Sequence, residues 1–97
     1  MDVFYSFQGA NFEWNVNKAQ SNVQKHGVTF EEAAEAFFDP FYQIGDASVE
    51  AEQREFIIGY TFSQQLLLAV FVERRNQTRI ISARPATGAE RELYEEG

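Results

Sequence analysis

The amino-acid sequence predicts an α+β fold in which helices pack on one face of an antiparallel β-sheet. Three segments rich in β-forming residues lie between residues 54 and 84, joined by short turns, as in an antiparallel meander. Two capped helical segments precede them and one follows, so strands and helices do not alternate one for one. The predicted order is β(β)-α-α-(β)-β-β-β-α, and the length of 97 residues suits one domain over residues 1–97.

The first predicted elements are an aromatic hairpin and a helix. "DVFYSF" and "NFEW" are β-forming runs on either side of Gly9, which marks a turn, so we expect a hairpin or a bent strand. Asn15 is a residue type that commonly caps the start of a helix. Apolar residues at positions 16, 19 and 23 then have helical spacing, which predicts a helix with a narrow buried stripe that ends at Gly27.

The segment "TFEEAAEAFFDP" is the clearest helix in the sequence. Thr29 and Glu32 have the spacing of a capping box, and apolar residues at positions 30, 33, 34 and 37 form one face. We expect the helix to stop at Asp39-Pro40, because the residue before a proline avoids the α region. "FYQI" is then an optional strand, and "GDASVEAEQ" is an acidic loop.

The last four elements are three strands and a helix. The strands are predicted in "REFIIGYTF", "LLLAVFVE" and "TRIISAR", and Pro85 ends the third. Thr87 and Glu90 form a second capping box, which predicts a C-terminal helix through "GAERELYEE".

The charge of the chain is unevenly distributed. A net charge of −7 argues against general nucleic-acid binding. However, residues 31–55 hold eight acids and one base, whereas residues 74–84 hold four arginines and no acid, so a local site can be positive. The absence of cysteine excludes disulfides and thiolate metal sites and favours the cytoplasm. Neither a signal peptide nor a membrane span is expected.

Two arginines flank the last predicted strand, in "RIISAR". A guanidinium presents a fork of donors that matches phosphate, so Arg79 and Arg84 are candidates for a phosphate clamp. Their opposite parity would send them to opposite faces of a regular strand, unless a bulge or the strand end re-aims one of them. The alternative is that both are solvated or salt-bridged.

The only histidine, His26, follows Lys25 at the end of the first predicted helix. Imidazole is well suited to proton transfer at neutral pH, and the C-terminus of a helix favours cations. These two residues are therefore candidates for catalysis. The alternative for His26 is an exposed cation that only interacts with the helix dipole.

Three further residues are candidates for binding a substrate. Arg54 is the lone base of the acidic segment, and it could equally pair with Glu50 or Glu55. Ser82 shares a strand face with the second arginine, and Trp14 either belongs to the core or stacks on a base. The sequence has no metal-binding, P-loop or dinucleotide motif and no convincing nucleophilic triad. Any chemistry is therefore expected to need no metal or cofactor and to act on a phosphodiester.

Taken together, "FEWN…K…N…KHGVTFEEA", "DP", "IG" and "RIISARPAT…ER..YEE" resemble the BrnT toxins of bacterial type II toxin–antitoxin systems, from Phe12 to Glu96. The resemblance implies a RelE-like fold and cleavage of RNA without a metal, which inhibits translation. It also implies a BrnA-like, DNA-binding antitoxin that neutralises the toxin in a hetero-oligomer, so that DNA is contacted only through the antitoxin.

The resemblance also implies roles for individual residues. Lys25 or His26 would move protons, while Arg79 and Arg84 would stabilise charge on the phosphorane, and we expect these groups to converge in one pocket. Arg54 matches a basic position before a sheet strand. The acidic composition leaves a second function open, namely a catalytically silent module that holds its antitoxin through residues 31–55.

Overall fold

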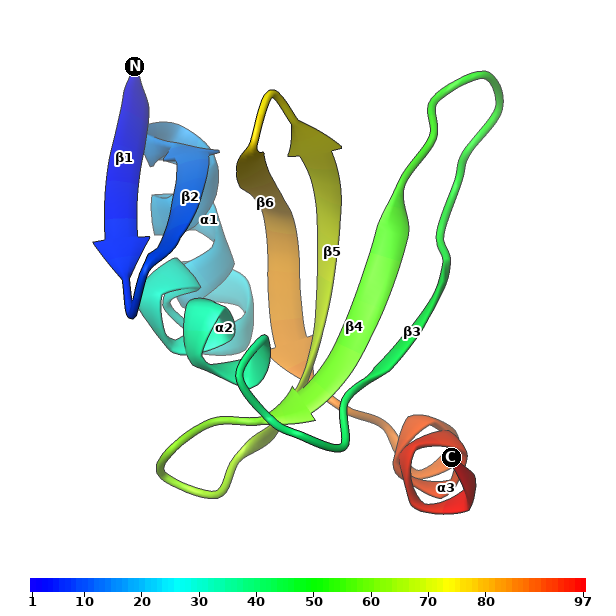
Figure 1. Ribbon diagram of the computed structural model, residues 1–97. Coiled ribbons are helices and arrows are strands. Elements are labelled where there is room, and N and C mark those ends of the chain that lie inside the picture. The colour runs from blue at the N-terminus through cyan, green and yellow to red at the C-terminus, as the bar shows by residue number, and fades with distance from the viewer.

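The computed structural model describes residues 1–97 and contains one six-stranded sheet and three helices (Figure 1). The elements, in chain order, are β1 (Asp2–Phe7), β2 (Ala10–Asn15), α1 (Val16–His26), α2 (Phe30–Ala36), β3 (Gln43–Asp46), β4 (Glu55–Tyr60), β5 (Leu66–Arg74), β6 (Gln77–Pro85) and α3 (Gly88–Glu96). The order of elements agrees with the prediction, and both optional strands form.

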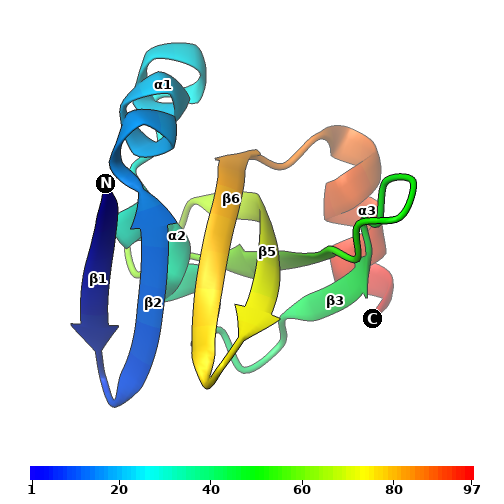
Figure 2. The same ribbon diagram turned by 90° about the horizontal axis from the view of Figure 1, so that it is seen from above.

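The sheet has the strand order β1-β2-β6-β5-β4-β3. The predicted meander of β4, β5 and β6 is confirmed, but the prediction of a wholly antiparallel sheet is wrong. Strands β2 and β6 are parallel and pair only at Phe12 with Thr78 and at Glu13 with Arg79 (Figure 2). This short junction joins the N-terminal hairpin to the meander. It unites segments more than 60 residues apart, so no local sequence pattern encodes its direction.

The predicted helix caps are confirmed. The Asn15 side chain accepts hydrogen bonds from two backbone N–H groups of α1, and both capping boxes are complete. Gly27 ends α1 with φ 69°, a left-handed conformation that glycine adopts without steric cost. None of the helices is both long and apolar enough to cross a membrane.

The main core lies between the sheet and the two helices α1 and α2. The residues of this core that are most buried include Phe12, Trp14, Val28, Phe30, Ala33, Ala34, Ile57, Leu67, Ala69, Phe71, Ile80 and Ala83. A Cβ atom on Gly59 would lie 2.5 Å from the carbonyl oxygen of Ala36, so glycine at this position lets α2 approach β4 closely.

Helix α3 packs on the opposite face of the sheet, so the prediction that all helices cover one face is wrong. Figure 1 shows α3 well separated from α1 and α2. Tyr94 packs with Ile58, Leu66 and Leu68 in a second apolar cluster. The physical reason is that β4 and β5 carry continuous apolar runs, which are typical of strands buried on both faces.

Candidate functional site

Helix α1 runs beside the edge of β6 that β2 leaves uncovered (Figure 2). Because β2 turns into α1 after only two paired positions, the backbone of Ala83 has no neighbouring strand on this side. The Asn22 side chain takes that place, since its Oδ1 accepts from the N–H of Ala83 at 3.1 Å and its Nδ2 donates to the carbonyl of Ala83 at 2.7 Å. Asn22 therefore positions α1 against β6.

The sequence pattern does not identify Asn22, because the spacing of the apolar residues predicts that Val23 is buried instead. In the structure Asn22 is 6% exposed, and Val23 is 44% exposed. The only signal available in the sequence was that Asn22 follows Ala19 by three residues, which places it on the same side of the helix.

A hollow of about 360 Å³ lies between α1 and β6. The residues that line it are Asn17, Lys18, Ser21, Asn22, Lys25, His26, Ile81 and Ser82. Two lysines and the histidine thus line the same hollow as Ser82, and no carboxylate lines it. Lys25, His26 and Ser82, which were separate candidates, line the same hollow. Lys18 was missed although it lies seven residues, or two helical turns, before Lys25. We call this hollow the α1–β6 site.

A β-bulge in β6 decides where its two arginines point. Val70 pairs with Ser82 and Phe71 pairs with Ile80, so Ile81 is an extra residue on β6. The bulge explains why Ile80 and Ala83, three residues apart, both face the main core. It follows that Arg79 and Arg84, which precede Ile80 and follow Ala83, lie on the same opposite face of the sheet. The parity of the two positions left open whether the arginines share a face, and the bulge is what places them on the same face.

The arginines nevertheless do not converge with the imidazole, so the expectation of one shared pocket is wrong. Arg79 Nη1 donates to Glu13 at 2.7 Å, and its Nη2 donates to Asp2 at 3.1 Å. These hydrogen bonds raise the pKa of Arg79 and lower the pKa of Asp2. Neither Arg79 nor Arg84 lines the α1–β6 site.

Arg84 is held by α3. Its two terminal nitrogens donate to the two oxygens of Glu90, at 2.7 and 2.8 Å. This bidentate pair, with help from the N–H of Thr87, lowers the pKa of Glu90 to about 2. A carboxylate thus fills the fork of Arg84 in the way that a phosphate would.

The pair between Arg84 and Glu90 leads to a pH-dependent prediction. The pKa of Glu90 is about 2 in the folded chain and 4.5 in the unfolded reference, so its contribution to stability is complete above pH 4.5 and is lost as the pH falls towards 2. Thermal melts followed by circular dichroism should show a steeper loss of stability between pH 5 and 2 in the wild type than in Glu90→Gln. Equal slopes in the two proteins would contradict the assignment.

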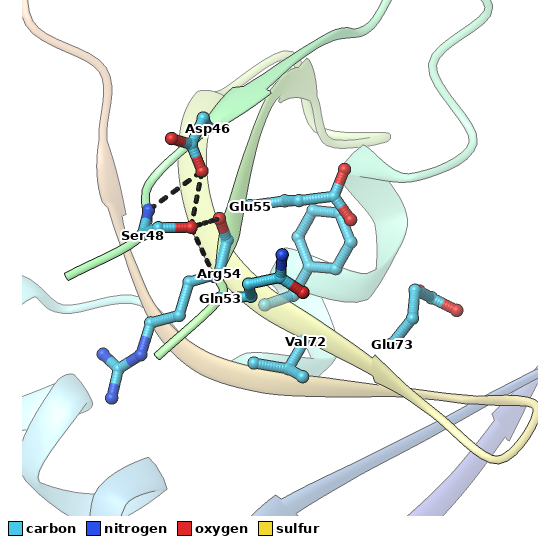
Figure 3. Close-up of a pocket in the computed structure, with 8 residues that line it drawn as sticks. Asp46, Ser48, Gln53, Arg54, Glu55, Val72 and Glu73 are labelled. Carbon is cyan, nitrogen blue, oxygen red and sulfur yellow. Dashed lines mark hydrogen bonds between the residues drawn. The ribbon is translucent and has the colours of Figure 1, made fainter. Parts of the chain in front are cut away.

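Arg54 lies outside the α1–β6 site. It lines a separate hollow of about 310 Å³ that also contains three carboxylates, those of Asp46, Glu55 and Glu73 (Figure 3). Its ion-pair partner is Glu52, at 2.9 Å, rather than either of the two glutamates expected from the sequence. The three carboxylates would repel a phosphate, so this hollow is a poor site for one.

Trp14 is too deeply buried in the structure to stack on a base. It is 2% exposed, and its ring packs edge-on against Phe30, with centroids 5.7 Å apart. The prediction that it stacks on a nucleotide is therefore wrong, and its alternative role in the core is confirmed.

Asp39 has a structural role that the sequence does not indicate, since the sequence predicts only that a helix stops at Asp39-Pro40. It is 8% exposed and accepts hydrogen bonds from the N–H of Phe41, the N–H of Tyr60 and the hydroxyl of Tyr94. Burial alone would raise the pKa of Asp39, but the three hydrogen bonds outweigh it and lower the pKa. Asp39 thereby ties the end of α2 to β4 and to α3.

No group of three or more histidine, cysteine, aspartate or glutamate side chains is arranged to hold a metal ion. What the fold and the site define is a small mixed α+β protein that presents a cationic hollow, free of carboxylates, beside its sheet.

The family model for the BrnT ribonuclease toxin of type II toxin–antitoxin systems matches residues 14–90. The chain therefore belongs to the BrnT family of ribonuclease toxins. The crystal structure of the Brucella abortus ribonuclease toxin BrnT superimposes with a TM-score of 0.53 at 24% identity, covering 76% of this chain and 92% of the other, which supports the fold. Among curated proteins no relative matches the chain.

Proposed function

We propose that residues 1–97 form one RelE-like toxin domain that cleaves RNA without a metal ion and so inhibits translation in the cytoplasm. The observation that carries the proposal is the α1–β6 site. There Lys18, Lys25 and His26 line one hollow together with Ser82, without a competing carboxylate. Cations around a hydroxyl suit a phosphodiester, and a proton-transfer group lies among them.

The proposed reaction is transesterification within the RNA strand. The 2′-oxygen attacks the adjacent phosphorus while a base on the enzyme takes its proton, and the bond from phosphorus to the 5′-oxygen breaks as an acid protonates that oxygen. The products are a 2′,3′-cyclic phosphate and a 5′-hydroxyl. His26 moves the protons, and the ammonium of Lys25 stabilises the charge on the phosphorane.

Arg79 and Arg84 take part only if the substrate displaces their carboxylates. Both lie on the sheet face that also carries Ser82, so an RNA strand on this face passes their guanidinium groups. A phosphate replaces Glu90 on Arg84 with the same bidentate geometry. Their proposed role is therefore to bind charge on the substrate after an exchange of partners.

The test is to incubate the purified protein with RNA, with and without EDTA, and to identify the cut ends. We expect cleavage that EDTA does not abolish, with 2′,3′-cyclic phosphate ends. Lys25→Gln should slow cleavage by about tenfold to a thousandfold, whereas Arg91→Gln, which removes the same charge on α3, should not. A requirement for a divalent metal, or 3′-hydroxyl ends, would refute the mechanism.

The proposed partner is a BrnA-like antitoxin that binds DNA, in a toxin–antitoxin hetero-oligomer. Exposed acids at Glu31, Glu50, Glu52 and Glu55 offer a surface of complementary charge to a basic antitoxin segment. The chain itself is proposed to contact neither DNA nor a membrane.

The alternative function is a catalytically silent module that only holds the antitoxin. It is favoured by one observation, that Arg79 and Arg84 are both engaged by carboxylates. The two functions separate in one experiment, because the silent module forms the complex but leaves RNA intact.

A further inference from the structure

We infer that the N-terminal hairpin and the turn between β5 and β6 form a second RNA subsite, which stacks one base on Phe4 and holds the adjoining phosphates with Arg74 and Arg75. This inference rests on the proposed function and extends it to a place on the chain outside the α1–β6 site. The subsite is a hollow of about 560 Å³ lined by Phe4, Glu13, Arg74, Arg75 and Gln77.

Phe4 is an aromatic side chain that the core does not use. It lies on β1 opposite Glu13 and is 69% exposed, whereas its neighbours Tyr5 and Phe7 pack against the main core. An exposed ring next to cationic groups is the arrangement with which proteins bind single-stranded RNA, because every base offers a face for stacking.

Two arginines in the hollow beside Phe4, Arg74 and Arg75, have no ion-pair partner. Of the nearby carboxylates, Glu13 and Asp2 are both paired with Arg79, at 2.7 and 3.1 Å, and Glu73 accepts a hydrogen bond from the hydroxyl of Thr78 at 2.7 Å. The guanidinium groups of Arg74 and Arg75, which no carboxylate contacts directly, therefore remain available to contact phosphate.

One polar atom of a residue that lines this hollow has no partner within the protein. The Oε1 atom of Gln77 is buried and has no hydrogen-bond partner. A rotation of its amide would present an unused acceptor to a donor on the edge of a base.

The two sites lie along one face of β6. Gln77 lines the hollow beside Phe4, Ser82 lines the α1–β6 site, and Arg79 lies between them on the same face. Five strand residues span roughly 16 Å, so a few nucleotides of extended RNA reach from one site to the other.

The family model covers only part of the subsite, namely Arg74, Arg75 and Gln77. The family model begins at residue 14, so β1 and Phe4 lie outside it.

The test measures binding of a fluorescent 2′-O-methyl oligouridine, which cannot be cleaved because its 2′-oxygen carries no proton. Phe4→Ala should weaken binding by about fivefold to a hundredfold, and Phe4→Trp should restore it. The matched control is Phe41→Ala, which removes an aromatic ring that is 73% exposed elsewhere on the surface and should leave binding unchanged.

A second measurement does not depend on the aromatic variant. Changing Arg74 and Arg75 to Gln should lower the slope of log affinity against log salt by about 0.7 for each arginine. If the wild type cleaves RNA but Phe4→Ala binds like Phe41→Ala and the salt slope is unchanged, this inference alone is overturned. If the wild type neither binds nor cleaves RNA, the proposed function fails as well.

Discussion

His26→Ala should slow RNA cleavage by about 10²–10⁴-fold, the usual contribution of a positioned proton-transfer group. His26 is the only imidazole of the chain, and it lies in the α1–β6 site with Lys25 and Ser82. The measurement is the single-turnover rate of cleavage of a defined RNA at saturating protein.

The matched control for His26 is Gln24→Ala. Gln24 is also exposed on the last turn of α1, but it does not line the site, so its loss should leave the rate unchanged. Because His26 is exposed, its loss should change the free energy of unfolding by less than about 0.5 kcal/mol, which a thermal melt checks. Loss of activity in Lys25→Ala with normal activity in His26→Ala would transfer the proton-moving role to Lys25. Normal activity in both variants would contradict the site.

Asp39→Ala should lower the free energy of unfolding by about 3–4 kcal/mol. The substitution removes a buried carboxylate and leaves the N–H of Phe41, the N–H of Tyr60 and the hydroxyl of Tyr94 without their acceptor. A fully buried donor left unpaired costs about 1–3 kcal/mol, and these part-buried donors belong at the low end of that range, about 1 kcal/mol each. For a chain of this length, the melting temperature should fall by at least about 12 °C.

The matched control for Asp39 is Asp46→Ala. Asp46 also accepts from a backbone N–H and from a hydroxyl, both of Ser48, but it is exposed, so its loss should cost no more than about 1 kcal/mol. Tyr94→Phe removes one of the three donors and should fall between the two. Equal unfolding free energies for Asp39→Ala and Asp46→Ala, measured by urea titration, would show that the buried network does not stabilise the fold.

Residue type and position in the sequence predict only some of the residues of the candidate site. Lys25, His26 and Ser82 were proposed from residue type and position, and the structure brings them together. Arg54 and Trp14 were proposed on equal grounds, yet one lines another hollow and the other is buried. Residue type indicates what a side chain can do, whereas its neighbours in space decide whether it is accessible.

Signals that act within a few residues were sufficient for the helices and the meander. A cap residue forms hydrogen bonds within its own helical turn, and a short turn between two β-forming runs leaves few alternatives to pairing, so each element is specified locally. The sequence by itself therefore determined the order of elements and the positions at which the helices begin.

Only the tertiary structure decided how these elements combine. Three features join residues that are distant in the chain, namely the parallel contact of β2 with β6, the position of α3 and the pairing of Arg79 with Asp2. The bulge at Ile81 depends on such contacts between distant segments. Their stability comes from burial and charge compensation across the assembled sheet, and these energies exist only once the distant segments have met.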